Sequence, residues 1–207
     1  MHKVIRTVLV TAAAVVGAAA LTVGAAMAVG AFDYHRRPGG PGAPASPRDL
    51  VDRSPGLVRP GTLTVDRSIG RRRAAQEVHL AQQLYTFWNT GEQKYLDAAV
   101  SPRFRDNTLP SGRPQGPTGP LIASKDFRAA GPDLTCEPAD LLVTGDRIAA
   151  RLVLRGHFTG TFHGLRGKGQ RIRFDAIDIQ HVGTDKIVED WHIEDDETLL
   201  RQLGVTG

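Results

Sequence analysis

The sequence RIRFDAIDIQHVGTDKIVEDWHI, residues 171–193, has the pattern of a β-hairpin: two strands of alternating character joined by a turn at residues 183–185. Side chains of a strand point alternately to its two faces, so one face of the first strand carries Ile172, Phe174, Ala176 and Asp178. An ionised carboxylate on an apolar, inward face is costly unless it is protonated, paired or hydrogen-bonded. Asp178 is therefore the first candidate functional residue.

Helical patterns precede the strands. Apolar residues recur at three- and four-residue steps between Arg71 and Gly91, which predicts a helix. Shorter helices are predicted over residues 93–100 and 121–130, and strands over residues 134–137, 140–143 and 147–158. The intervening residues 106–120 are rich in Pro, Gly, Ser and Thr and predict a loop across a cavity mouth. Helices followed by a run of antiparallel strands predict an α+β domain, with helices packed in the concave face of a curved sheet.

Several short motifs follow one another in the second half of the chain. They are the RG…TG…F.G segment at residues 155–164, the Gly-Gln-Arg turn at 169–171, the strand with Asp178, DKIVEDW at 185–191 and LLRQLG at 199–204. In this order they resemble the C-terminal half of SnoaL-like polyketide cyclases, and LYTFWNTG at residues 84–91 adds a weaker match. The resemblance covers most of residues 75–205. It implies the NTF2-like cone, with no metal and no cofactor.

The resemblance also implies a role for Asp178. Family members use an acidic residue in this strand as the general acid/base for an aldol ring closure. Burial in an apolar pocket raises the pKa of a carboxyl group, so that it can exchange a proton with a carbon acid or a carbonyl oxygen near neutral pH. The alternative is a buried aspartate that only accepts hydrogen bonds from the backbone or from an arginine.

The expected histidine partner is displaced. Where SnoaL-like sequences commonly read Arg-Gly-Thr-His-Thr-Gly, this chain reads Arg-Gly-His-Phe-Thr-Gly at residues 155–160. A shift of one residue sends a side chain to the opposite face of a strand. We therefore expect His157 to point out of the cavity and Phe158 to face into it. His192, on the neighbouring strand, is the candidate replacement for the missing imidazole.

Further side chains are candidates for contact with a ligand. Tyr85 and Trp88 lie in the first helix, where packing in the core is the alternative to a place at the cavity. Asn107 lies where relatives often have Asp-His and is a candidate hydrogen-bonding partner of a ligand carbonyl. Phe174 shares the strand face of Asp178.

The N-terminal region predicts export. Residues 1–32 combine a basic start with a long apolar run, the pattern of a signal peptide or an uncleaved membrane anchor. Residues 33–70 contain six prolines and predict an extended linker. The SnoaL-like domain is then expected at residues 71–207. It would be extracytoplasmic, either secreted or anchored in the cell membrane by the N-terminal segment.

Composition narrows the classes of partner and site. The chain has 207 residues, a formal charge of +4 and one cysteine, Cys136, which excludes a disulfide framework within the chain and a cysteine-based metal site. The arginines are scattered and have no interleaved aromatic residues, so nucleic acid is not expected as a partner. The motifs of P-loop, dinucleotide-binding, serine hydrolase and zinc protease sites are absent.

Two functions fit these observations. The first is an exported, cofactor-independent enzyme in which Asp178 acts as general acid/base on a small hydrophobic carbonyl compound, in aldol-type cyclisation, isomerisation or hydration. The second is a non-catalytic module that holds a small ligand or a partner at the cell surface. The strand of Asp178 favours the first function, while export and the displaced histidine favour the second. Both functions are compatible with a homodimer.

Overall fold

The computed structural model describes residues 46–204, so the expected signal or anchor segment at residues 1–32 lies outside the described range. Within that range, no helix is long and apolar enough to cross a membrane. The elements in chain order are η2 (Pro47–Leu50), β1 (Thr62–Val65), α1 (Arg71–Thr90), α2 (Gln93–Ala99), β2 (Val100–Asp106), α3 (Thr118–Ala130), β3 (Thr135–Thr144), β4 (Arg147–Phe158), β5 (Thr161–Phe162), β6 (Leu165–Arg166), β7 (Gln170–Val182), β8 (Ile187–Glu194) and α4 (Asp196–Gln202).

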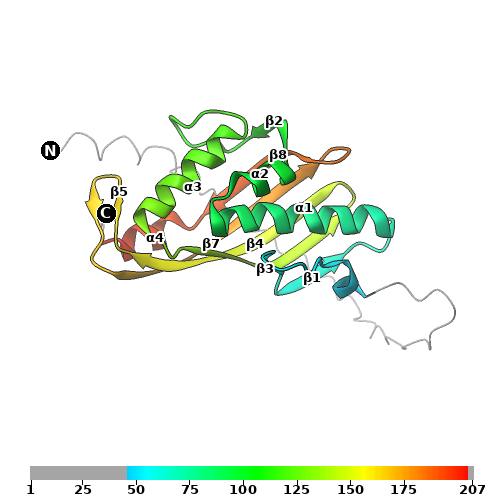
Figure 1. The fold of residues 1–207 in the computed structure, drawn as a ribbon, viewed down its shortest axis with the longest axis horizontal. Helices are drawn as coiled ribbons and strands as arrows, with labels where there is room; N and C mark the ends of the chain where they lie inside the picture. Colours follow the sequence, from blue (N-terminus) through cyan, green and yellow to red (C-terminus); the bar gives the residue numbers. More distant parts are fainter. Residues whose placement is uncertain (1–45, 205–207) are drawn as a thin grey trace, which may run out of the picture. The chain divides into compact units, whose positions relative to one another are not determined.

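The main sheet has six strands in the order β1-β3-β4-β7-β8-β2, and the α+β class predicted from the sequence is confirmed. Its four central strands are antiparallel, as expected. The two edge strands differ from the expectation, because β1 pairs in parallel with β3 and β2 in parallel with β8. Parallel pairing requires a long connection: α1, α2, β2 and α3 lie between β1 and β3 in the chain, and α3 and β3 to β7 lie between β2 and β8. Figure 1 shows α1, α2 and α3 on one side of the curved sheet.

The helices form largely where the sequence predicts them. α1 ends at Gly91, which adopts the left-handed conformation (φ 72°) and donates its backbone N–H to the carbonyl of Phe87. α3 begins three residues before its predicted start, at Thr118. The sequence analysis missed β2, because Pro102 and the polar residues after it resemble a loop, whereas an edge strand tolerates a proline.

The hydrophobic core lies between the helices and the inner face of the sheet. Inward residues of β4 and β7 alternate as predicted and are buried: Ile148, Ala150, Leu152, Leu154, Ile172, Phe174 and Ala176. Three side chains of α1 pack against them: Val78, Ala81 and Leu84.

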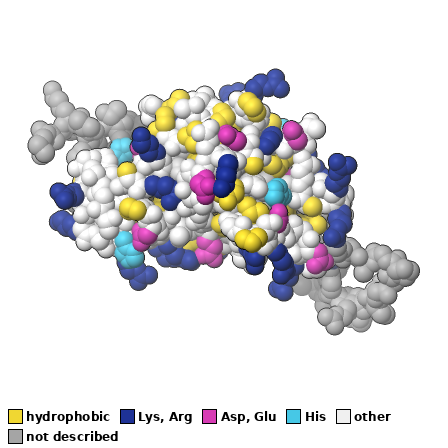
Figure 2. Space-filling view, viewed as in Figure 1, with side chains coloured by type: hydrophobic (Ala, Val, Ile, Leu, Met, Phe, Trp, Pro, Cys, Tyr) yellow, Lys and Arg dark blue, Asp and Glu magenta, His cyan; other side chains and the backbone are white. Residues whose placement is uncertain are grey.

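On the face of the molecule seen in Figure 2, basic and acidic side chains are interspersed with apolar ones.

The prediction that residues 33–70 form an extended linker is wrong for the described part, residues 46–70. These residues include β1, and they are held by buried polar side chains of α1. The amide of Gln82 accepts from the backbone N–H of Asp52 (2.9 Å) and donates to the carbonyls of Asp52 and Val58 (both 2.8 Å), while Thr86 Oγ1 accepts from the N–H of Val58 (3.0 Å). A segment poor in apolar residues can thus be anchored through its backbone, which composition does not reveal.

Candidate active site

A cavity lies between α1, α3 and the inner face of the sheet. The cavity has a volume of about 70 Å³. Its floor is apolar and is formed by Leu134, Cys136, Leu152, Leu154, Phe174 and Ala176. Its polar end carries Asp106, Asp178, Asp190, His192 and Glu194.

Asp178 lies where the alternation of β7 predicts it, on the inward face and only 6% exposed. Its Oδ2 accepts a hydrogen bond from the hydroxyl of Tyr85 (3.3 Å). Gln180 donates from its amide to the same hydroxyl oxygen (2.9 Å) and approaches Asp178 Oδ2 at 3.5 Å. Because the amide donates to the Tyr85 oxygen, the hydroxyl hydrogen of Tyr85 is left to point at Asp178.

Burial raises the pKa of Asp178 from its ordinary 3.8 to about 7; the charge of His192 opposes this rise and that of Glu194 adds to it. The carboxyl group therefore populates both its protonated and its ionised form near neutral pH. A group in this state can both take up and return a proton during one reaction.

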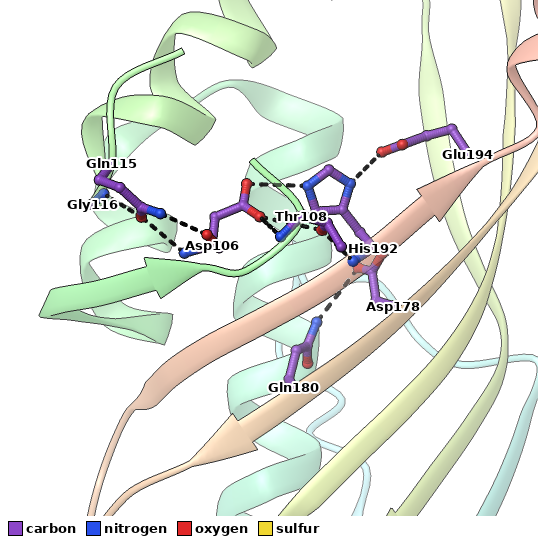
Figure 3. A network of polar contacts seen from close by, with 8 residues as sticks. All are labelled: Asp106, Thr108, Gln115, Gly116, Asp178, Gln180, His192 and Glu194. Carbon is purple, nitrogen blue, oxygen red and sulfur yellow. Dashed lines mark hydrogen bonds and ion pairs between the residues drawn. The ribbon is translucent and has the colours of Figure 1, made fainter. Parts of the chain in front are cut away.

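His192 lies directly opposite Asp178 in the pairing of β7 with β8. Its Nε2 is 3.1 Å from Asp106 Oδ2 and its Nδ1 is 2.8 Å from Glu194 Oε1, and its backbone N–H donates to Thr108 Oγ1 (2.8 Å) (Figure 3). Burial alone would lower the pKa of His192, but the hydrogen bond and charge of Glu194, with the charges of Asp190 and Asp106, raise it to about 10. At neutral pH the ring is thus an imidazolium held between two carboxylates.

Three acids of this site were not predicted from the sequence. Asp190 and Glu194 share the inward face of β8 with His192, so the two-residue period that identified Asp178 could have found them. Burial raises the pKa of Asp190 well above its ordinary value, with a further contribution from the charge of Asp178. Asp106 was missed because it ends β2, a strand that the sequence pattern did not indicate.

The aromatic candidates divide between two cavities. Trp88 and Phe174 line the cavity of Asp178, and Tyr85 lies fully buried behind it, bonded to the carboxylate. The prediction for Phe158 is wrong: it lines the second, smaller cavity, together with Phe174. Strand alternation places it on the inward face, but its pairing with Gln170 puts it at the far end of the sheet from Asp178, which pairs with Ala150.

Asn107 is not among the residues that line this cavity, and its contact with a ligand stays a prediction. Its backbone N–H donates to the carbonyl of Asp190 (2.9 Å), and the neighbouring Asp106 takes the inward position. The expectation for His157 holds, since the ring is half exposed on the outer face and its Nδ1 is hydrogen-bonded to Asp133 Oδ2 (2.7 Å). Among residues 46–204, no three His, Cys, Asp or Glu side chains are arranged to hold a metal ion.

Comparisons with known proteins agree with this fold. The model of the family described as SnoaL-like polyketide cyclase matches residues 78–203. The chain is similar to the crystal structure of a candidate polyketide cyclase from Bacillus cereus ATCC 10987, with 41% identity and a TM-score of 0.68 over 76% of this chain and 99% of that one. It is also similar to IdmH, a candidate polyketide cyclase from Streptomyces antibioticus, with 30% identity and a TM-score of 0.57 over 63% of this chain and 99% of that one.

TsrD from Streptomyces laurentii is a third similar structure, with 26% identity and a TM-score of 0.59 over 64% of this chain and 97% of that one. None of the curated proteins compared with the chain matches it. The family match extends from within α1 to the end of α4 and includes Asp178 and His192. The chain belongs to the SnoaL-like polyketide cyclase family.

Proposed function

We propose that the protein is a cofactor-independent acid–base enzyme that acts through Asp178 on a small hydrophobic carbonyl compound. Aldol-type cyclisation, isomerisation and hydration all fit this chemistry. One observation carries the proposal: Asp178, with a pKa of about 7, lies where the apolar floor of the cavity meets the cationic ring of His192. The candidate polyketide cyclases similar to this chain support the same class of substrate.

Each polar residue has a distinct part in the proposed reaction. The Asp178 carboxylate removes a proton from a carbon next to the carbonyl group of the substrate and returns it later. Tyr85 stabilises the carboxylate form by donating its hydroxyl hydrogen. His192 has both ring nitrogens engaged by Asp106 and Glu194, so it acts through its positive charge, which favours the enolate formed when the proton leaves.

A proton-exchange assay tests the proposal without knowledge of the natural substrate. We expect the full chain to accelerate hydrogen–deuterium exchange at the acidic carbon of 2-tetralone in D₂O, measured by NMR, and Asp178→Asn to abolish the acceleration. Asp175→Asn is the matched control, because Asp175 lies in the same strand with its side chain paired with Arg151 outside the cavity. Exchange that is equally fast in the wild type and in Asp178→Asn would refute the catalytic role.

A second candidate is the non-catalytic binding module. The observation that favours it is that no histidine of residues 46–204 presents a free imidazole to the cavity: His157 faces outward and both nitrogens of His192 are engaged. A co-purifying small molecule that binds equally well to the wild type and to Asp178→Asn, with no proton exchange in either, would support this alternative. Native mass spectrometry of the purified protein would detect such a ligand.

We also propose that the domain acts outside the cytoplasm. The support is the basic start and apolar run of residues 1–32. Protease added to intact cells should then digest the domain. If the domain is protected until the cells are lysed, the proposal is wrong and a cytoplasmic biosynthetic role gains support.

A further inference from the structure

α3 presents a polar pair to the cavity that the chemistry of Asp178 does not use. Four of its residues line the cavity: Pro120, Ser124, Phe127 and Arg128. Their spacing places them along one face of the helix, with Ser124 and Arg128 one turn apart. Ser124 and Arg128 thus form a polar wall of the cavity on α3. The acidic end of the cavity, with Asp106, Asp178, Asp190 and Glu194, lies on β2, β7 and β8.

Ser124 is a buried hydroxyl without a partner. The residue is 3% exposed, and its Oγ has no hydrogen-bond partner within residues 46–204. A buried hydroxyl that forms no hydrogen bond is costly, and serines inside a helix usually bond back to the preceding turn. The hydroxyl therefore has an unused hydrogen-bonding capacity at the wall of the cavity that Ser124 lines.

Arg128 is held in position but has no acidic partner among residues 46–204. Its Nη2 donates to the carbonyl of Trp88 (2.7 Å) at the end of α1, and its buried Nε has no hydrogen-bond partner in the part of the chain that the structure describes. Gly91 allows the close approach, since a Cβ at that position would lie 2.8 Å from the Nε. Burial, with no charged neighbour contributing, lowers the pKa of Arg128. A partly desolvated cation of this kind favours an anionic ligand group.

The acidic end of the cavity surrounds the single cation of His192 with carboxyl groups, so a permanent carboxylate is favoured less there than beside Arg128. Asp106 and Glu194 flank His192 there, and Asp178 and Asp190 add two further carboxyl groups. A ligand that carries one carboxylate and one carbonyl group is therefore oriented by charge. Its carboxylate lies near α3 and its reactive carbon lies near Asp178.

We propose that Ser124 and Arg128 form a subsite for the carboxylate of the ligand, so that the compounds taken by this protein are hydrophobic keto acids. The inference deepens the proposed function, because it names the substrate class of the same cavity. Arg128 supplies charge-assisted hydrogen bonds from a fixed guanidinium group, and Ser124 supplies a neutral donor beside it.

Benzoate and methyl benzoate are matched probes for this subsite, because they differ in the charge of one group. Binding to the full chain is followed by the NMR shift of the Trp88 indole N–H, and Trp191, on the outer face against Arg147, provides an internal reference. We expect benzoate to bind about tenfold more tightly than its ester. Arg128→Gln should weaken benzoate binding about tenfold and leave the ester unchanged, and Ser124→Ala should weaken benzoate binding by a smaller factor.

Arg155→Gln is the control, since Arg155 pairs with Glu137 outside the cavity and its loss should change neither affinity. The inference is overturned if benzoate and its ester bind equally well to the wild type, or if Arg128→Gln weakens both to the same extent. Binding is measured without turnover, so the result is separable from the catalytic proposal. Equal binding of both probes together with an Asp178-dependent proton exchange would remove the subsite and leave the proposed function intact.

Discussion

Replacing Asp178 with asparagine is expected to stabilise the protein above pH 7 and to have little effect on its stability below pH 4. Burial raises the pKa of Asp178 from 3.8 to about 7 in the folded state. Between these two pH values Asp178 holds a proton in the folded state that it has released in the unfolded state. Its contribution to the free energy of unfolding is therefore fully present below pH 4 and is lost as the pH rises through 7.

The magnitude follows from the size of this change. One pKa unit corresponds to about 1.4 kcal/mol, so the rise from 3.8 to about 7 removes about 4 kcal/mol from the free energy of unfolding of the wild type at pH 8. Asparagine has nearly the same shape and can still accept the hydrogen bond from Tyr85, but it has no charge to desolvate. The variant should therefore exceed the wild type by up to about 4 kcal/mol in free energy of unfolding at pH 8.

Urea unfolding at several pH values between 4 and 8 measures this difference from the midpoints and slopes. Asp140→Asn is the control with the opposite sign: hydrogen bonds from Thr62 and Arg151 lower the pKa of the half-buried Asp140. That variant should be less stable than the wild type at neutral pH, with the difference closing as the pH falls. If the advantage of Asp178→Asn does not grow between pH 4 and pH 8, the carboxyl group is not destabilised by burial and the reasoning fails.

Three further outcomes are expected. A chain that begins at Arg71 should lose about 2–6 kcal/mol of stability relative to one that begins at Ser46, because four hydrogen bonds between residues 52–58 and α1 are removed; equal urea midpoints would contradict this. Arg73→Met should cost about 3–5 kcal/mol in the same measurement, because it leaves the buried Glu77 unpaired, and adding Glu77→Leu should restore only part of the loss, because the hydrogen bonds from Arg73 to the carbonyls of residues 182–184 stay broken; an unaltered midpoint in Arg73→Met would count against the buried pair. The ring resonances of His192 should keep their protonated positions in NMR spectra up to about pH 9, and a titration midpoint near 6.5 would show that the acids around the ring do not hold its charge.

Local patterns in the sequence determined much of this fold. The limits of α1 follow from its apolar spacing and from Gly91, whose left-handed conformation ends the helix. The alternation in β7 placed Asp178 on the inner face, and the one-residue displacement of His157 placed that ring on the outer face. Each of these features depends on neighbours within a few residues, which is why a single sequence reveals them.

Only the tertiary structure decided which inward side chains share a cavity. Alternation gives the face of a strand but not the position along the sheet, so Phe158 faces inward and still lies in a different cavity from Asp178. The polar end joins Asp106 to His192, from segments 86 residues apart, and the sequence pattern did not indicate the strand that supplies Asp106. The anchoring of residues 46–70 likewise depends on buried side chains of α1 that bond to a distant backbone. Long-range hydrogen bonds and ion pairs form only once the chain has folded, because they join residues whose spacing along the chain carries no periodic signal.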